Sequence, residues 1–469
     1  MRSLRTSPRT AGRIRWLLIG VLCLTPAVSQ AVAPFVLETV DAGGGSIVGE
    51  YSSLKLDRLG RPHIAYYDAN AGNLKYARHN GTQWLIETAD SAIADVGQFA
   101  SLALDSLNRP HIAYYDETIG KLRYTTKSGA TWIREIADSN SFDCGWYPSI
   151  AIDALGRPSI ASYDRGRGNP RYSTRLSPGN WIGATIDTTF DLSGFYASLA
   201  IDSKKRPHVA YLNLTRGILQ YATRIDGIWR QETVDSSSAN VGYYSSLKLD
   251  RFGRVHIAYM DLANGLLKHA LLNPATRRWS REVVDGGTEI AGYDCALTMD
   301  AIEYPNISYH NGTTLHFMMA RQTPTGWQKL VVDDSPGVTG LFSSIASDSM
   351  GNMFMSYHDG SAFTLRFARL ASQVLDAGPL KPRAGLALSP NPARSGERVR
   401  FAAESDARAI ELFDLAGRRI TRLTTDATGH ALWDGRTAAG APVAAGLYFA
   451  RALRGDGSTS ATKPIVLTR

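Results

Sequence analysis

Ser53-Leu-Lys-Leu-Asp57 leads into Pro62-His-Ile-Ala-Tyr-Tyr-Asp68, and the same order returns in Ser101-Leu-Ala-Leu-Asp105 and Pro110-His-Ile-Ala-Tyr-Tyr-Asp116. Self-similarity at a fixed period marks a repeat architecture, in which each unit is completed by its neighbours. The aspartate that ends the first segment recurs in steps of 48 to 50 residues. Its seven positions are Asp57, Asp105, Asp153, Asp202, Asp250, Asp300 and Asp348.

Each unit contains four short segments in which β-branched and aromatic residues alternate with others, and turn-forming residues separate them. In the first unit these turns are Leu59-Gly-Arg61, Asn70-Ala-Gly72 and His79-Asn-Gly81. No segment keeps a helical period over an adequate length. Four strands per unit at such a period are typical of a propeller blade, and blades bury their faces by stacking in a ring. The sequence therefore predicts an all-β fold with a seven-bladed β-propeller over residues 34–373.

The two ends of the repeat array predict how the ring closes. Six units carry a tryptophan in the last strand, but the seventh, which runs through Leu365-Arg-Phe-Ala368, has none after it. Phe35-Val-Leu-Glu-Thr-Val-Asp41 matches Leu85-Ile-Glu-Thr-Ala-Asp90. We therefore expect the N-terminal segment to supply the outer strand of the last blade, because pairing the two ends removes an exposed sheet edge. Gln373-Val-Leu-Asp376 is the alternative candidate for that place.

The first 33 residues have the layout of a secretory signal peptide. Five arginines and no acid lie within the first fifteen residues, an apolar run extends from Trp16 to Leu24, and small residues follow from Ala27 to Ala33. A transmembrane anchor is the alternative, but the apolar run is shorter than the roughly 20 residues that a span needs. We expect an exported protein, secreted or held at a bacterial cell surface, with no transmembrane segment once the signal is removed.

Net charge and cysteine content narrow the possible partners. The chain carries a formal charge of +8, and the five arginines of the signal peptide account for much of it. Residues 384–469 contain twelve Lys and Arg against eight Asp and Glu, so the repeat region is close to neutral. No basic stripe is present, and nucleic acid is not expected as a partner. Cys144 and Cys295 remain after signal removal; a disulfide is permitted in an exported protein, but their spacing does not establish one.

Beyond a linker at residues 374–385, marked by Pro379 and Pro382, the repeat stops. Residues 386–469 hold stretches of alternating hydrophobicity joined by Gly and Asp turns, which predicts a small antiparallel β-sandwich. These stretches are Leu388-Ser-Pro-Asn-Pro392, Ile410-Glu-Leu-Phe-Asp-Leu-Ala-Gly-Arg-Arg419, Leu432-Trp-Asp-Gly435, Gly440-Ala-Pro-Val-Ala-Ala-Gly-Leu-Tyr-Phe449 and Lys463-Pro-Ile-Val-Leu-Thr-Arg469.

Both parts resemble known modules. Over roughly residues 35–376 the repeat resembles those of NHL- and BNR-type propellers, which implies an architecture rather than an activity. The sialidase Asp-box, Ser-x-Asp-x-Gly-x-x-Trp within one hairpin, is absent from every unit, so no sialidase catalytic residue is transferred.

The C-terminal part has an Asn-Pro start, a Phe-Asp-Leu-Ala-Gly-Arg strand, a Trp-Asp-Gly turn and a Gly-Leu-Tyr-Phe strand. In these features it resembles a FlgD-type Ig-like domain and the C-terminal sorting domain of type IX secretion cargo. That resemblance implies a role in export or surface attachment without an active site. A cleaved sorting signal and a permanent Ig-like module both remain open.

Histidines occupy equivalent positions in four units, at His63, His111, His208 and His256. A shared metal ion would need nitrogens about 2.0–2.1 Å away, and side chains on separate blades are too far apart for that. We therefore expect each histidine to hydrogen-bond within its own blade, with the recurring aspartate as a partner. Asp68, Asn70 and Gly72 fit a β-turn better than a calcium loop, because other units lack a regular series of oxygen ligands. No metal or other cofactor is predicted.

A Gly-x-aromatic segment precedes the first strand of most units. In a propeller this connection borders the mouth of the central channel, so the copies would surround it. Aromatic faces rimmed by polar groups suit sugars, peptides and other amphipathic ligands. The regular aromatic position is expected mainly to pack between blades; its residues are Tyr51, Phe99, Tyr147, Tyr196, Tyr244 and Phe342.

The position before the aromatic residue varies and is expected to face solvent: Glu50, Gln98, Trp146, Phe195, Tyr243, Tyr293 and Leu341. Units three and six depart from the pattern, with Asp143, Cys144, Asp294 and Cys295. No catalytic residue is assigned. We place the candidate ligand site on Glu50, Gln98, Trp146, Tyr147, Phe195, Tyr243, Tyr293 and Asp294.

Two classes of function follow from these features. P-loop, GxSxG, HExxH and CxxC motifs are absent from the sequence. The leading hypothesis is a non-enzymatic binding or surface protein, with a glycan or peptide at the channel mouth and export or attachment machinery as the partner of the C-terminal domain. The alternative is an extracellular polysaccharide hydrolase or lyase, whose carboxylate pair would come from Asp143, Asp191, Glu289 and Asp294. A purely structural propeller is a third option.

Overall fold

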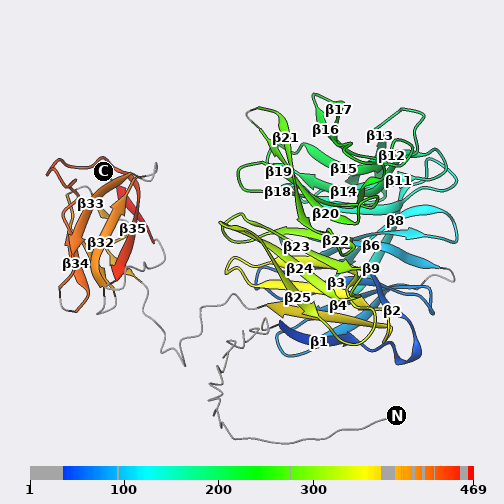
Figure 1. Cartoon of the computed structure of the whole chain (residues 1–469), viewed down its shortest axis with the longest axis horizontal. Coiled ribbons are helices and arrows are strands. Elements are labelled where there is room, and N and C mark those ends of the chain that lie inside the picture. Colours follow the sequence, from blue (N-terminus) through cyan, green and yellow to red (C-terminus); the bar gives the residue numbers. More distant parts are fainter. Residues whose placement is uncertain are drawn as a thin grey trace, which may run out of the picture. The chain divides into compact units, whose positions relative to one another are not determined.

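The computed structural model describes residues 35–91, 95–274, 276–370 and most of 386–468. The chain divides into two compact units between Ser372 and Gln373 (Figure 1). The described elements are β-strands apart from one short 3-10 turn, Gly43–Gly45, so the fold is all-β as expected. The expected signal peptide, residues 1–33, and the expected linker, residues 374–385, lie outside the described residues.

The first unit is built from seven sheets of four antiparallel strands, numbered one to seven in chain order. This repetition is consistent with a propeller. Sheet one contains β2 (Val48–Leu56), β3 (Pro62–Asp68), β4 (Asn73–His79) and β5 (Trp84–Asp90). Sheet two contains β6 (Val96–Leu104), β7 (Pro110–Asp116), β8 (Lys121–Ser128) and β9 (Thr131–Asp138). Sheet three contains β10 (Trp146–Ile152), β11 (Pro158–Asp164), β12 (Asn169–Ser177) and β13 (Asn180–Thr185).

The remaining sheets follow the same order. Sheet four contains β14 (Ser193–Ile201), β15 (Pro207–Asn213), β16 (Ile218–Ile225) and β17 (Ile228–Asp235). Sheet five contains β18 (Val241–Leu249), β19 (Val255–Asp261), β20 (Leu266–Asn273) and β21 (Arg278–Asp285). Sheet six contains β22 (Ala291–Met299), β23 (Pro305–Asn311), β24 (Phe317–Thr323) and β25 (Gly326–Asp333). Sheet seven contains β26 (Leu341–Ser347), β27 (Met353–Asp359), β28 (Thr364–Leu370) and β1 (Phe35–Asp41).

The recurring aspartate fixes the turn between the first two strands of each sheet. Asp57 accepts the N–H groups of Leu59 and Arg61 at 2.8 and 2.9 Å and the Arg61 Nε at 2.7 Å. His63 Nε2 lies 3.7 Å from Asp57 Oδ2, and its Nδ1 is 2.5 Å from the Tyr76 hydroxyl of the same sheet. The expectation that the histidines bond within their own sheet is therefore confirmed.

The first strands of successive sheets lie side by side in a cycle, and β26 of sheet seven lies beside β2 of sheet one. A serine hydroxyl on one first strand accepts the backbone N–H of the next first strand. Six such bonds measure 2.8–3.1 Å, and one of them joins Ser344 of sheet seven to the Leu54 N–H of sheet one. Each bond satisfies an N–H group that has no strand partner on that side. At the joint between sheets six and seven, Ala296 stands where the serine would be.

The strand β1 pairs antiparallel with β28 and completes sheet seven, as the N-terminal sequence predicts. The side chains of β1 bond to residues of sheet one, as the side chains of the outer strand β5 bond to the equivalent residues of sheet two. Glu38 accepts the Trp84 indole N–H at 3.1 Å and Asp41 accepts the Tyr66 hydroxyl at 2.6 Å, both from sheet one. The matching residues of β5, Glu87 and Asp90, take the Trp132 indole and Tyr114 hydroxyl of sheet two in the same way. The alternative segment, residues 373–376, lies outside the described residues.

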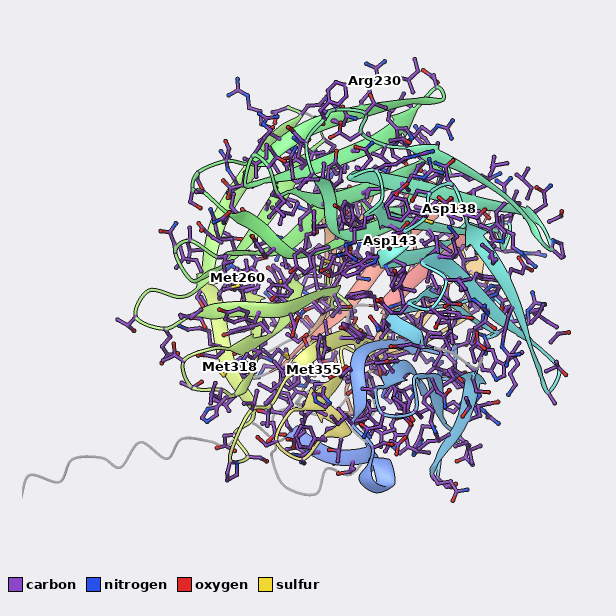
Figure 2. All side chains as sticks on the ribbon, turned by 90° about the vertical axis from the view of Figure 1, so that its right-hand side faces the viewer. Asp138, Asp143, Arg230, Met260, Met318 and Met355 are labelled. Carbon is purple, nitrogen blue, oxygen red and sulfur yellow. The ribbon has the colours of Figure 1, made fainter. Side chains whose placement is uncertain are left out.

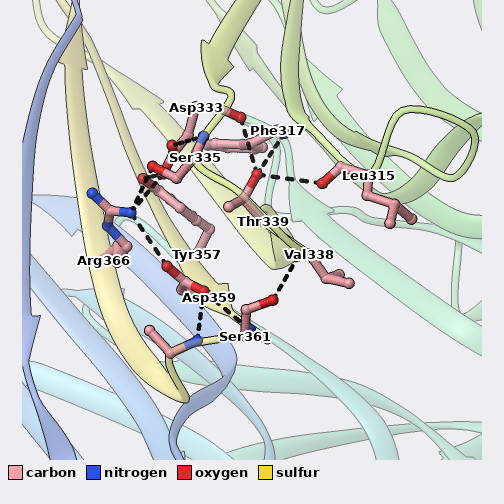
Figure 3. Close-up of polar contacts among 11 residues, drawn as sticks. Leu315, Phe317, Asp333, Ser335, Val338, Thr339, Tyr357, Asp359, Ser361 and Arg366 are labelled. Atoms are coloured by element: carbon pink, nitrogen blue, oxygen red, sulfur yellow. Dashed lines mark hydrogen bonds and ion pairs between the residues drawn. The ribbon is translucent and has the colours of Figure 1, made fainter.

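Figure 3 shows the aspartate–tyrosine link at the joint between sheets six and seven. Asp333, at the end of β25, accepts the Tyr357 hydroxyl of β27 at 2.5 Å and pairs with Arg366 of β28 at 3.0 Å. Arg366 also reaches Asp359 at 3.2 Å. Outer strands are thus fastened to the middle strands of the next sheet by buried, charge-assisted hydrogen bonds.

The second unit contains two sheets around one apolar core, which includes Phe401, Ile410, Trp433 and Ile465. The ring of Trp433 meets that of Tyr448 at a centroid distance of 5.9 Å. The first sheet contains β29 (Ala387–Ser389), β31 (Val399–Ala402) and β34 (His430–Trp433). The second contains β30 (Ala393–Arg394), β36 (Lys463–Thr468), β35 (Gly446–Arg454), β32 (Ala407–Phe413) and β33 (Arg419–Thr424). One pair, β30 with β36, is parallel, so the expectation of a wholly antiparallel sandwich is wrong at that edge.

Removal of the Tyr66 hydroxyl tests the role of β1. Tyr66→Phe deletes one charge-assisted hydrogen bond to Asp41, and we expect the free energy of unfolding to fall by about 1–3 kcal/mol. Tyr114→Phe deletes the equivalent bond in the next sheet and is expected to cost a similar amount. Urea unfolding of both variants gives the comparison. A neutral Tyr66→Phe beside a destabilising Tyr114→Phe would show that β1 does not hold its place in solution.

Candidate functional site

The Gly-x-aromatic segments form a bulge at the start of each first strand. In β2 the pairing with β3 shifts register between Glu50 and Ser53, and Tyr51 has a left-handed backbone with φ of 54°. A bulky residue in that conformation is uncommon, and a bulge redirects its side chain. The equivalent residue has φ between 49° and 56° in all seven sheets: Tyr51, Phe99, Tyr147, Tyr196, Tyr244, Asp294 and Phe342.

The glycine two residues earlier makes this bulge possible. Gly97 has φ of 113°, and a Cβ at that position would lie 2.8 Å from Leu74 Cα of the preceding sheet. At Gly145 the corresponding distance, to Leu122 Cα, is 2.6 Å. The positive φ and the close approach both disfavour any other residue, which explains why the glycine recurs in each unit.

We call the seven bulge side chains the aromatic layer. Neighbouring ring centroids within it are 4.5–4.8 Å apart, in the order Phe342, Tyr51, Phe99, Tyr147, Tyr196 and Tyr244. The prediction that this position packs between sheets is therefore confirmed, and Tyr147 is part of this packing. Burial raises the pKa of the Tyr51, Tyr196 and Tyr244 phenols, so these hydroxyls stay protonated and remain hydrogen-bond donors.

Asp294 interrupts the aromatic layer between Tyr244 and Phe342. Its Oδ2 accepts the Phe342 N–H at 2.9 Å. Burial raises the pKa of this carboxyl to about 6, and the bond from Phe342 opposes that shift. Its charge in turn helps to raise the pKa of Tyr51 and Tyr196, so the carboxyl lies among rings from several sheets.

Trp146 lies beside the aromatic layer in sheet three, and its indole belongs to a polar cluster. Its Nε1 donates to Asp143 Oδ1 at 3.0 Å, and the Arg165 guanidinium lies 4.8 Å from its ring centroid. Asp143 also accepts the Tyr115 hydroxyl at 2.8 Å and pairs with Arg165 at 3.1 Å. The Arg165 side chain is 57% exposed, whereas that of Trp146 is half-buried. Figure 2 shows Asp143 toward the middle of the view and Arg230, on an outer strand, at its edge.

Sheets one and two carry a related polar arrangement. Gln98 Nε2 donates to Asp95 Oδ2 at 3.2 Å, and Asp95 Oδ1 accepts the Tyr67 hydroxyl at 2.5 Å. Glu50 holds the same position in sheet one as Gln98 in sheet two, and burial raises the pKa of its carboxyl. This part of the mouth is therefore polar, in contrast to the aromatic sheets that follow.

The other candidates are aromatic and lie on sheets four to six. Ring-centroid distances are 4.2 Å from Phe195 to Tyr163, 5.6 Å from Tyr243 to Tyr196, and 6.0 Å from Tyr293 to Tyr244. All seven side chains at the variable position are half-buried. Each of them keeps part of its surface exposed, while the rings of Phe195, Tyr243 and Tyr293 also pack against other rings, so the exposure of this position to solvent stays a prediction.

Sequence reasoning missed several residues at this end of the sheets. Phe142 is 79% exposed in the connection into β10, and Phe190 is fully exposed in the connection into β14. A Cβ at Gly166 would lie 3.2 Å from the Phe142 ring, so that ring covers the hairpin that carries Arg165. The sequence signal for these residues is a phenylalanine within a polar loop. Exposed apolar groups often mark an interaction surface.

Each acid that the sequence offered for a catalytic carboxylate pair forms a hydrogen bond or ion pair with a different residue. Asp191 accepts from the Asn213 amide at 2.9 Å, and Glu289 accepts from the Asn311 amide at 2.6 Å. Asp143 is engaged by Arg165, as described above. Among the described residues, no group of three His, Cys, Asp or Glu side chains is placed to hold a metal ion.

The two cysteines are buried free thiols in different sheets. Cys144 Sγ lies 3.3 Å from the Asp138 carbonyl oxygen, and Cys295 Sγ lies 3.1 Å from the Tyr244 carbonyl oxygen. Ser52 makes the bond equivalent to that of Cys295, to the Phe342 carbonyl oxygen at 2.9 Å. Both thiols therefore act as small donors within the joints between sheets.

No protein-family model matches the chain, and no curated protein matches it. Many solved structures are similar to it, including the following three. One is the SapL1 lectin in complex with alpha methyl fucoside, at 14% identity and a TM-score of 0.44, over 61% of this chain and 97% of the lectin. Another is a fungal alcohol oxidase of the AA5 family in complex with copper, at 10% identity and a TM-score of 0.45, over 93% of this chain and 99% of the oxidase.

The third is PorZ of Porphyromonas gingivalis, a bacterial surface component of the type-IX secretion system, at 12% identity and a TM-score of 0.28, over 87% of this chain and 74% of PorZ. Similarity at these levels tells nothing about the ligand or activity of this chain. Within the described ranges, no helix has the length and apolar character needed to cross a membrane.

Asp294→Asn tests the buried carboxyl of the aromatic layer. Because the pKa of Asp294 is about 6 in the folded protein and lower in the unfolded chain, the wild type loses stability as pH rises from about 4 to about 6. The variant lacks this titration, and its amide oxygen still accepts the Phe342 N–H. We expect it to be more stable than the wild type at pH 7.5, by up to about 3 kcal/mol, and to lose that advantage near pH 4.

Thermal unfolding across this pH range gives the measurement. Asp226→Asn, at an exposed turn between β16 and β17, is the control and is expected to leave the wild-type profile unchanged. A constant difference between Asp294→Asn and wild type at every pH would contradict the assignment.

Proposed function

We propose that this chain is an exported, non-enzymatic binding protein whose ligand is a glycan or an amphipathic peptide. Its seven sheets act as the blades of a seven-bladed β-propeller over residues 34–373, and the ligand meets the end of the channel that carries the aromatic layer. The cyclic contact of the first strands and the place of β1 in sheet seven support this architecture.

The cluster of Trp146, Asp143 and Arg165 is the observation that carries the proposal. It combines a half-buried ring, a carboxylate that accepts the indole N–H, and an exposed guanidinium that pairs with the carboxylate and lies 4.8 Å from the ring centroid. Sugars present apolar C–H faces together with hydroxyl groups, so a ring edged by donors and acceptors suits them. Arg165 is long and exposed, and its side chain is free to move aside or to bond the ligand.

The second unit serves export or surface attachment in this proposal. Its two sheets and single core suit an Ig-like module over residues 386–469, of the kind that the FlgD-type or type IX sorting resemblance implies. Together with a signal peptide at residues 1–33, it would place the propeller outside the cell or on its surface.

A polysaccharide hydrolase or lyase is the second candidate, favoured by one observation. Glu50 and Asp294 both act on the Tyr51 phenol, and burial raises the pKa of both carboxyls. A carboxyl with a raised pKa is suited to donate a proton to a leaving group. Glu50→Gln and Asp294→Asn would then abolish turnover of a bound glycan, whereas the binding proposal expects the wild type to release every glycan unchanged.

A glycan array probed with the secreted full chain tests the proposed function. We expect selective binding to a small set of glycans and at least about a tenfold loss of affinity in Trp146→Ala, since a stacked ring contributes about 1–3 kcal/mol. Phe252→Ala is the matched control, because Phe252 is an exposed aromatic residue of the β18–β19 turn, at the opposite end of the sheets. Binding that survives in Trp146→Ala would remove this cluster from the site, and a lack of any glycan or peptide binding would overturn the proposal.

A further inference from the structure

The first strands present three successive layers of side chains to the space that they enclose. Side chains two residues apart share a face of a strand and are separated by about 6.6–6.8 Å. In β2, Ser53 and Lys55 follow this spacing, and Tyr51 precedes them in the bulge, whereas Ser52 and Leu54 are buried against neighbouring sheets. Below the aromatic layer comes the layer of serines that join the sheets, and below the serines comes a third layer.

Most residues of the third layer are small. Two lysines are the exceptions, one on sheet one and the other on sheet five. The seven equivalent residues are Lys55, Ala103, Ala151, Ala200, Lys248, Thr298 and Ala346. Alanine leaves the centre of this layer open, so the two long side chains have room to extend into it.

Lys55 and Lys248 hold equivalent register positions on two first strands, opposite His63 and His256, so both side chains extend into the space that the cycle of first strands encloses. Sheets one and five are not neighbours in the cycle of first strands, since sheets six and seven separate them on the shorter side. Even so, the charge of Lys248 acts on the Lys55 amine. Burial, and to a smaller extent the charge of Lys248, together lower the pKa of Lys55 to about 7, and burial also lowers the pKa of Lys248.

No carboxylate among the described residues is paired with either lysine. The Lys55 amine donates to the Leu54 carbonyl oxygen at 3.1 Å. Asp57 and Asp250, which follow on the same two strands, are bound by Arg61 and Arg254. Asp294 lies in the aromatic layer and binds the Phe342 N–H. The histidines paired across from the lysines, His63 and His256, bring no negative charge.

We propose that Lys55 and Lys248 form a binding site for a small anion, such as sulfate, phosphate, chloride or a carboxylate, in the third layer of the channel. Both lysine side chains are half-buried. Two ammonium groups in one space repel each other, and their partial removal from water is costly without a partner. One anion between them offsets both effects through charge-assisted hydrogen bonds. The packed rings of the aromatic layer narrow one end of the channel, so the anion enters from the end that carries the Asp57 turn.

This site goes beyond the proposed function, because it involves neither Trp146 nor the mouth cluster. A negatively charged group bound there stabilises the folded unit by a free energy that rises with the logarithm of its concentration above the dissociation constant, since the site does not exist in the unfolded chain. It also links the first strands of two non-adjacent sheets.

Isothermal titration calorimetry with sodium sulfate, sodium chloride and sodium acetate tests the site, using the full chain at pH 6 in a buffer of large organic ions. That pH lies below the pKa of Lys55, so most of the Lys55 amine is charged. We expect saturable binding of at least one of these anions and a loss of about tenfold or more in affinity in Lys55→Met and in Lys248→Met. Lys204→Met removes an exposed charge of the β14–β15 turn and is expected to leave the affinity unchanged.

Crystals of the wild-type chain soaked in sodium bromide give a second measurement that does not depend on the variants folding. The anomalous signal of bromide is expected between the two lysine amines. A map without that peak, together with calorimetry that shows no binding of the three anions, would overturn the proposal. Equal affinity in wild type and in the Lys55→Met, Lys248→Met double variant would overturn it as well.

Discussion

The serine hydroxyls that accept a backbone N–H from the next first strand are the contacts on which the first unit depends. Each first strand has a partner on one side only, and its other edge would expose unpaired N–H groups. A hydroxyl from the neighbouring sheet satisfies one of these groups and sets the distance between sheets. Because Ser344 repeats this bond to Leu54, the last sheet meets the first in the same geometry as any other pair.

Sheet six lacks the serine that bonds to the next sheet. It departs from the repeat at two positions, and the second substitution compensates for the first. Ala296 lacks the hydroxyl that would reach the N–H of the next strand. In the same strand, Asp294 replaces an aromatic residue and binds a different N–H of β26, that of Phe342. Ser343 in turn donates to the Asp294 carbonyl oxygen at 2.9 Å. The Asp294 carboxylate therefore connects sheets six and seven, where a serine hydroxyl connects the other sheets. This role explains why a titratable group lies inside the aromatic layer.

The repeat made the architecture predictable. A residue that recurs in each unit makes the same contact between each pair of neighbouring sheets. The match between the segments ending at Asp41 and Asp90 predicted the position of β1 correctly, since both aspartates bind a tyrosine of the next sheet. The candidate site was less predictable. Arg165 and Phe142 lie in turns whose residues differ from unit to unit. The contact of Arg165 with Trp146 and the approach of Phe142 to the hairpin at Gly166 depend on how those turns fold in space. The recurring glycine is the sequence signal of the backbone bulge, but it does not show that the bulge half-buries the variable position.

The pairing of β1 with β28 has a consequence for how the molecule is made. Phe35 is among the first residues of the unit to be synthesised, yet its partner Leu370 is among the last. Closing so long a loop is entropically costly and slow, so the final edge forms after the other sheets have assembled. Until then the sheets form an open arc, and both of its borders carry unpaired N–H and C=O groups on which another chain could pair.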